Sequence, residues 1–331
     1  MTGKGKDNKA LGVEFDTVSS LLGDLVTPSN TRPRFVFFGG KGGVGKSSLA
    51  AATALWLAKK GYKTLLVSTD LQKSQNDILQ QDVGGAETQV KGIKNLKVIN
   101  VDAKESIRKH QLEVMKKIEA LKGNDWEIQF LKEHWEKNPI LPCETASYNV
   151  FVEYLNSTIY DAFVFDTAPG GHNFEMVGYP WRHLDNLKKS ILAKKEVADI
   201  TGKVAEIELL EKMSQDNMRA IEKLNSDQTT YLLVLHPEML PVYEAKRIQE
   251  SLQPYGIKVK GLVLNEILPE EHCKDEFFAD RRKLQEKYIG LVKKEFPELA
   301  IGQVRMLDTE IVGLKAVERV AESLYGKPGG I

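Results

Sequence analysis

Cysteine, net charge and long apolar runs are all scarce in this chain of 331 residues. Only Cys143 and Cys273 are present, too few for a disulfide framework, and this indicates a reducing compartment. The 46 Lys and Arg residues balance 46 Asp and Glu residues, which argues against nucleic acid held through bulk positive charge. No apolar run approaches the ~18 residues that a membrane-spanning helix needs, and no apolar stretch of a secretion signal follows the Lys-rich segment Met1–Ala10. We therefore expect a globular, cytoplasmic protein without a nucleic-acid partner.

Short apolar runs alternate with longer helical patterns along the chain. Most of these runs are continuously apolar, as expected of strands that are buried on both faces of a parallel sheet. The candidate strands are Arg34–Phe38, Thr64–Ser68, Lys97–Val101, Ala162–Phe165, Thr230–Leu235 and Val259–Leu264. The alternation predicts an α/β fold with a doubly wound, mostly parallel sheet. We expect residues 1–33 to be an N-terminal lead-in with a loop before the first strand, 34–320 to be the main domain, and 321–331 to be a flexible C-terminal tail.

Two segments, at about 102–140 and 184–226, do not fit the sheet. Both are rich in charge and carry apolar residues at helical spacing. We expect helices inserted into the α/β framework and packed together as a subdomain. Two interpretations stay open, a small helical cap with a core of its own and a groove or lid that contacts a client protein.

The strongest motif follows the first predicted strand and precedes an Ala-rich helical stretch, Ser48–Lys59. It satisfies G-x-x-x-x-G-K-[ST], and its residues are Gly40, Lys41, Gly42, Gly43, Val44, Gly45, Lys46 and Ser47. Its glycines let backbone N–H groups turn toward phosphates, and the positive end of the helix dipole faces the same way. The pattern places Lys46 for the β- and γ-phosphates and the Ser47 hydroxyl for Mg²⁺. We count the adjacent Ser48 among the candidate nucleotide-binding residues.

Lys41 is a second lysine inside the loop, which an ordinary P-loop does not need. A cation there could reach a phosphate across a dimer interface and stabilise charge in the transition state, as an arginine finger does. A solvated loop lysine is the alternative.

Three carboxylates complete the candidate site. Asp70 follows the predicted strand Thr64–Ser68, Asp77 lies further along the same segment, and Asp166 ends another strand. Ligands bind such sheets at the C-terminal ends of the strands. One carboxylate could hold Mg²⁺ through water and another could orient the attacking water. Ser47, Asp70 and Asp166 are the candidate metal residues.

These motifs resemble the ArsA/Get3 family, ATPases of the deviant Walker A class. The family includes arsenite-pump ATPases and the targeting factor for tail-anchored membrane proteins. The stretch Gly39–Ser47 is similar to the family P-loop, with Lys41 as its signature lysine. The second switch of the family is matched by Asp166–Pro169 with Gly171 and His172.

The resemblance implies a Mg²⁺-dependent homodimer that hydrolyses ATP and switches a helical client or partner surface. It implies that Lys41 acts across the dimer and that Asp77 orients the hydrolytic water. It also implies that Glu238 and Asn265 contact the nucleotide, Asn265 at the adenine. A membrane-protein client or a membrane receptor would be the partner.

The chain departs from the family pattern in several places, and two of them bear directly on hydrolysis and on metal binding. The first switch usually reads D-P-A-H-[SN]-x-x-D, whereas residues Asp70–Asp77 read D-L-Q-K-S-Q-N-D. Both end carboxylates remain, so we expect hydrolysis, and a weakly hydrolysing nucleotide-bound scaffold is the alternative. Targeting members often hold zinc with C-x-x-C, but Cys273 is followed by Lys-Asp-Glu, so zinc is not expected.

Other functions remain open at this stage. A positioning ATPase of the ParA/MinD kind shares the signature lysine and would use DNA or a membrane as its matrix. Balanced charge argues against DNA, and the end of the chain, Gly326–Ile331, is not a basic amphipathic helix. An arsenite-pump-associated ATPase is another alternative, although the sequence has no cysteine trio that suggests an arsenite site.

Overall fold

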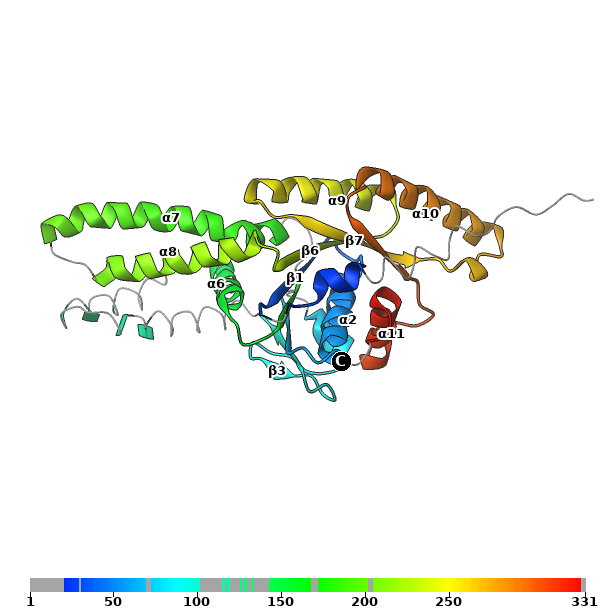
Figure 1. Cartoon of the computed structure of the whole chain (residues 1–331), viewed down its shortest axis with the longest axis horizontal. Coiled ribbons are helices and arrows are strands. Elements are labelled where there is room, and N and C mark those ends of the chain that lie inside the picture. The colour runs from blue at the N-terminus through cyan, green and yellow to red at the C-terminus, as the bar shows by residue number, and fades with distance from the viewer. Residues whose placement is uncertain are drawn as a thin grey trace, which may run out of the picture.

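The computed structural model describes residues 21–29, 31–69, 73–101, 143–167, 172–201 and 205–328, and scattered residues between 115 and 133. These residues build an eight-stranded sheet in the order β3-β4-β2-β5-β1-β6-β7-β8. The pair β3–β4 is antiparallel, and every other pair of neighbours is parallel. Helices cover both faces (Figure 1), so the predicted doubly wound, mostly parallel α/β fold is confirmed.

All six predicted strands are present, β2 with the predicted bounds and the others with ends that differ by at most three residues. They are β1 (Arg34–Gly39), β2 (Thr64–Ser68), β4 (Leu96–Asn100), β5 (Ala162–Asp166), β6 (Thr229–Leu235) and β7 (Val259–Ile267). Two edge strands, β3 (Thr88–Gln89) and β8 (Ala300–Arg305), were not predicted. β8 is only partly buried and contains Gly302 and Gln303, so it lacks the continuous apolar run of the central strands.

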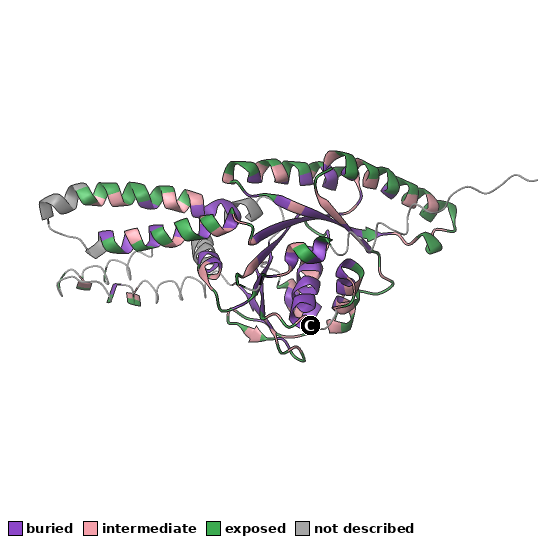
Figure 2. Cartoon of the chain, in the orientation of Figure 1, coloured by how far each residue is buried: buried purple, intermediate pink, exposed green. Residues whose placement is uncertain are grey.

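Side chains of β1 alternate between two core layers, one on each face of the sheet. Val36 and Phe38 belong to the layer under α2 and α11, whereas Phe35 and Phe37 belong to the layer under α6, α9 and α10. The helices are α2 (Lys46–Lys59), α6 (Cys143–Asn156), α9 (Met239–Leu252), α10 (Glu276–Glu295) and α11 (Leu314–Tyr325). Figure 2 shows the strands and α2 as largely buried.

A pair of long helices, α7 (His172–Thr201) and α8 (Ala205–Leu224), extends away from the sheet (Figure 1). α7 begins well before the predicted insert at 184 and passes through Pro180. The pair has a small core of its own, which consists of Ile118, Leu187, Leu209, Leu210 and Met213. Ile118 comes from the first predicted insert, most of which lies outside the described residues.

Helical residues extend into the segments expected as the N-terminal lead-in and the C-terminal tail. Residues 21–26 are helical, and Leu22 and Val26 are fully buried in the layer that contains α2. α11 continues into the segment expected as a tail, because Leu324 and Tyr325 are buried and the Tyr325 hydroxyl hydrogen-bonds Thr53 Oγ1 at 2.7 Å. Among the described residues, no helix combines the length and apolarity that crossing a bilayer requires.

Candidate functional site

The glycine-rich loop joins the C-terminal end of β1 to the start of α2. Gly43 and Gly45 have φ angles of 78° and 91°, a region that side-chain-bearing residues rarely adopt. A Cβ atom on Gly45 would lie 2.3 Å from Asn265 Nδ2, whereas one on Gly43 would meet nothing within 4 Å. Gly45 is therefore required by both backbone conformation and space, and Gly43 by conformation alone.

Residues at the C-terminal ends of β6 and β7 pack directly against this loop. Asn265 on β7 is almost fully buried, and its Nδ2 donates to the Val44 carbonyl at 3.0 Å. A Cβ atom on Gly40 would lie 2.3 Å from the Val234 carbonyl on β6. Asn265 thus lies against the loop, and its contact with adenine stays a prediction.

The two lysines of the loop have different surroundings. Lys46 opens α2, is 6% exposed, and its Nζ donates to the Lys41 carbonyl at 2.8 Å. The Lys41 side chain is exposed, as are Gly42 and Gly43. Ser48 is half-buried in the first turn of α2. Lys46 is therefore held over the loop, whereas Lys41 projects from it.

Asp166 is the best-connected acidic residue of the site. It ends β5, is fully buried, and its Oδ1 accepts a hydrogen bond from Ser47 Oγ at 3.0 Å. Its Oδ2 lies 3.3 Å from Ser68 Oγ and 2.8 Å from Gln75 Nε2. The structure thus brings together Ser47 and Asp166, two of the three candidate metal residues. Asp70, the third, lies outside the described residues.

Gln75 belongs to this cluster, although it was not among the candidates. It lies on the short helix α3 (Ser74–Leu79) and is fully buried, and its Nε2 also donates to the Ser47 carbonyl at 3.1 Å. In sequence it is one polar residue in a polar segment, and no periodicity marks it as buried. Its place within the altered first switch was the only signal that pointed to it.

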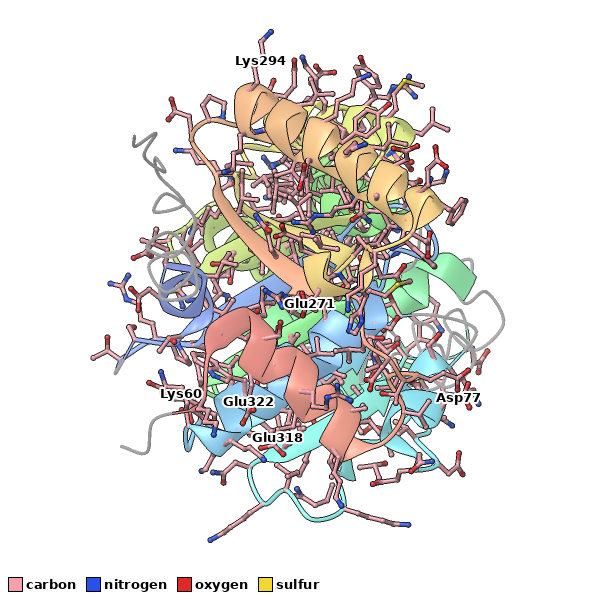
Figure 3. The ribbon with its side chains drawn as sticks, turned by 90° about the vertical axis from the view of Figure 1, so that its right-hand side faces the viewer. Lys60, Asp77, Glu271, Lys294, Glu318 and Glu322 are labelled. Carbon is pink, nitrogen blue, oxygen red and sulfur yellow. The ribbon has the colours of Figure 1, made fainter. Side chains whose placement is uncertain are left out.

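Asp77 lies on the same short helix but faces away from the cluster. Its side chain is exposed, and Figure 3 shows it toward the outer edge of the molecule. No described hydrogen bond joins its carboxylate to Asp166 or to the loop. The two switch carboxylates are therefore separate in this structure, and the role of Asp77 toward water stays a prediction.

A cavity of about 380 Å³ opens beside the loop. Lys41, Gly42 and Val44 line it on one side, and Glu238 lines it at the start of α9. Glu238 Oε1 accepts a hydrogen bond from Arg281 Nη2 at 3.0 Å. The volume of the cavity is in the range of small-molecule sites. Glu238, a candidate nucleotide contact, thus lies at the same cavity as the loop.

A buried aromatic residue supports the start of the loop. A Cβ atom on Gly39 would lie 2.6 Å from the Tyr231 ring, so the strand end and this ring pack directly. Burial raises the pKa of Tyr231, and its hydroxyl is therefore neutral at physiological pH. Tyr231 contributes packing beside the phosphate loop without adding negative charge.

Cys273 ends the short 3₁₀ turn Glu270–His272, and its thiol lies 3.2 Å from the Pro269 carbonyl. Within the part of the chain that the structure describes, no three His, Cys, Asp or Glu side chains gather as a metal site. Ser47 and Asp166 offer a hydroxyl and a carboxylate oxygen instead. Such a sparse oxygen set suits Mg²⁺, which uses one or two carboxylates together with water and substrate phosphates.

Comparison with known proteins places the chain in a family. The sequence profile of the ArsA ATPases, described as anion-transporting ATPase, matches residues 33–326. An arsenical pump-driving ATPase of Halobacterium salinarum is 34% identical over 305 residues, which cover 91% of this chain and 45% of that relative. The chain thus spans less than half of that protein. Arsenical pump-driving ATPase 2 of Aquifex aeolicus is 31% identical over 303 residues, which cover 88% of this chain and 99% of the relative.

A eukaryotic relative is similar over a comparable length. ATPase ASNA1 homolog 1 of Paramecium tetraurelia is 26% identical over 319 residues, which cover 91% of this chain and 95% of the relative. The family profile extends from just before β1 to the end of α11 and includes the whole loop Gly40–Ser47. The chain therefore belongs to the ArsA family of anion-transporting ATPases, enzymes that bind and hydrolyse ATP.

Proposed function

We propose that the chain hydrolyses ATP with Mg²⁺ as a homodimer whose nucleotide state controls the helical extension formed by α7 and α8. The observation that carries this proposal is the cluster of Lys46, Ser47 and Asp166 at the N-terminus of α2. Backbone N–H groups, a helix N-terminus and a lysine favour phosphate at this point. The half-buried Ser47 hydroxyl and the buried Asp166 carboxylate supply oxygen ligands beside it.

Ser47 would hold Mg²⁺ through its hydroxyl, and Asp166 would hold it through water. These two residues fit Mg²⁺. A nearby cation stabilises the charged form of the fully buried Asp166 carboxylate, and both Ser47 and Asp166 offer hard oxygen atoms. When bound, the ion neutralises charge on the phosphate oxygens. The residues of the chain orient the nucleotide. Lys46 Nζ, which donates a hydrogen bond to the Lys41 carbonyl, would donate to a phosphate oxygen instead, and Asn265 keeps the loop in place.

The route from the nucleotide to the helical extension is short. Asp166 ends β5, and the segment that follows it leads directly to α7, which begins at His172. A change at Asp166 when the γ-phosphate leaves can therefore be passed to a 30-residue helix. We propose that the extension binds the apolar segment of a tail-anchored membrane protein. The exposed apolar side chains Leu192 and Met218 on α7 and α8 support this proposal.

Lys41 is the residue through which the two subunits would cooperate. It projects from the loop into the cavity beside Glu238, where a second subunit could approach it. In the proposed dimer Lys41 stabilises charge at the partner's ATP, and Asp77 orients water at its own. We expect Lys41→Ala to lower turnover by about 10²–10³-fold, the effect of removing one transition-state donor.

Mixing two inactive variants tests the proposed dimer. In a mixed dimer of Lys41→Ala and Asp77→Asn, one of the two sites regains both wild-type groups if Lys41 acts in trans. One of the two sites is restored in each mixed dimer, and random pairing makes half of the dimers mixed, so we expect turnover of a 1:1 mixture to rise to about a quarter of the wild-type value. No rise on mixing, in a sample from which two different affinity tags, one on each variant, recover mixed dimers, would contradict action in trans. Unchanged turnover in Asp77→Asn alone would remove Asp77 from the mechanism.

Calorimetry with adenine nucleotides tests the site itself. The wild-type chain should bind ATP in the presence of Mg²⁺, and Lys46→Ala should bind it more weakly. If wild type takes up no adenine nucleotide with Mg²⁺, the proposed function is wrong.

A second candidate function is an arsenical pump-driving ATPase, which the names of two relatives favour. Stimulation of turnover by arsenite would support this candidate. Stimulation by a detergent-solubilised tail-anchored protein, without an arsenite effect, would support targeting.

A further inference from the structure

Gln75 is a buried amide that connects the first-switch helix α3 to Ser47 and Asp166, two of the three candidate metal residues. Its Nε2 donates to Asp166 Oδ2 at 2.8 Å and to the Ser47 carbonyl at 3.1 Å. Two acceptors at this distance fix the orientation of the amide, because turning it over would set its oxygen against two other oxygens.

The other atom of the amide, Gln75 Oε1, is buried and has no hydrogen-bond partner among the described residues. Buried polar atoms are nearly always paired, and each exception calls for an explanation such as a water or an ion. Ser47 and Asp166, which the same amide contacts, are the residues proposed to hold Mg²⁺. The side chain with the unpaired oxygen therefore already contacts both Ser47 and Asp166 at the proposed Mg²⁺ site.

The backbone of α3 shows that tertiary contacts hold this helix in place. Lys73 before it and Gln80 after it both have positive φ angles, 55° and 49°, which are unfavourable for residues with side chains. Ile78 and Leu79 pack into the core, and the fully buried Gln75 side chain makes polar contacts with the end of β5 and with the loop. Gln75 thus links α3 directly to Asp166 and to the Ser47 backbone.

We propose that Gln75 is a positioning residue that couples Mg²⁺–nucleotide binding to the first-switch helix. Its N–H groups hold Asp166 and the Ser47 backbone in place, and its Oε1 accepts a hydrogen bond from a water of the Mg²⁺ shell once nucleotide is bound. Asp77 follows on the same helix, so the coupling reaches the residue proposed to orient the hydrolytic water. This inference rests on the proposed function, because it requires that Mg²⁺ and nucleotide bind at this loop.

The test compares ADP affinity measured by calorimetry with Mg²⁺ and with EDTA, so no turnover is needed. The ratio of the two dissociation constants measures how strongly Mg²⁺ and nucleotide binding are coupled. We expect Gln75→Leu, which keeps the size but removes both polar atoms, to reduce this ratio by about tenfold, the low end of the effect of losing a partner of a metal ligand. Hydrogen exchange at residues 74–79 should also lose the protection that MgADP gives the wild-type chain.

Gln285→Leu is the matched control. Gln285 is another buried glutamine and makes two hydrogen bonds to backbone, from the Leu268 N–H at 2.9 Å and to the Glu266 carbonyl at 3.0 Å. Its loss should lower the melting temperature and leave the Mg²⁺ ratio within about twofold, as expected for a structural contact away from the site. A Gln75→Leu variant that behaves like this control would overturn the proposal.

Gln75→Glu keeps the test decisive if the leucine variant does not fold. It retains an oxygen and places a second carboxylate beside Asp166, so repulsion between the two should make binding depend more steeply on Mg²⁺. The same Mg²⁺ ratio as wild type in Gln75→Glu would also overturn the proposal. A wild-type chain that binds no ADP under either condition would instead refute the proposed function.

Discussion

The nucleotide loop and the helical extension are built in opposite ways. The loop is fixed by buried groups from distant parts of the chain, Asn265, Asp166 and the Val234 carbonyl. The extension is mainly a pair of consecutive helices around a small core, and most residues of α7 between 181 and 195 are exposed or half-buried (Figure 2). The chemistry thus lies where the fold is most constrained, and the proposed client surface lies where it is least constrained. Substitutions should therefore affect the two regions separately.

Lys46→Ala should have the largest effect and should be confined to the loop. Removing the ammonium group takes away a charge placed for the transferred phosphate, so we expect turnover to fall by at least about 100-fold. Steady-state ATP hydrolysis measures this loss. Lys294→Ala, on the exposed surface of α10 (Figure 3), should leave turnover within about twofold. An equal loss in both variants would indicate a general effect of positive charge.

Gly45→Ala and Gly43→Ala separate space from backbone conformation in the loop. Both glycines have positive φ, but only a Cβ on Gly45 would meet Asn265. We expect Gly45→Ala to weaken nucleotide binding by more than about tenfold, and Gly43→Ala to weaken it less, since φ strain alone costs about 1–3 kcal/mol. Calorimetry compares the two. Adding Asn265→Ala to Gly45→Ala should recover part of the loss, and no recovery would contradict the steric explanation.

Leu209→Ala should destabilise the extension and spare the loop. Leu209 is fully buried in the core of α7 and α8, so its truncation should cost about 2–5 kcal/mol. Hydrogen exchange along both helices measures this loss. Leu192→Ala, at a side chain that is 64% exposed, should change stability by less than about 0.5 kcal/mol. If ADP affinity also fell in Leu209→Ala, the two regions would be coupled already in the ground state.

The sequence analysis succeeded for features that depend on local pattern. The central strands are continuous apolar runs because helices cover both faces of the sheet, and the loop motif has an invariant spacing between strand and helix. β8 was missed because an edge strand carries Gly302 and Gln303 and is only half covered. The early start of α7 was missed because Gly178 and Pro180 suggest a break, whereas contacts such as Trp181 with Tyr255 stabilise the helix there.

The residues of the candidate site also differ in whether local sequence pattern predicts them. Lys46 and Ser47 follow from the motif, and Asp166 follows from its place at the end of a buried strand. Gln75 does not, because its burial depends on where α3 packs against Asp166 and the loop, and these lie far apart in sequence. Local pattern predicts which residues can bind phosphate, whereas tertiary contacts decide which polar residue connects a switch to them.

His183→Gln should have the smallest effect at pH 7, and it tests whether the base of the extension is as firmly packed as the loop. His183 lies on α7, where its ring stacks on Tyr179 at 4.9 Å between centroids, and burial lowers its pKa to about 4. The unfolded chain, with a His pKa of about 6.5, binds more protons between these values, so stability is lost as pH falls through this window. Between pH 7 and pH 5 this residue should account for about 2 kcal/mol of lost stability. Denaturant unfolding should show a shallower pH dependence in His183→Gln, and parallel profiles for the two proteins would contradict a buried, neutral His183.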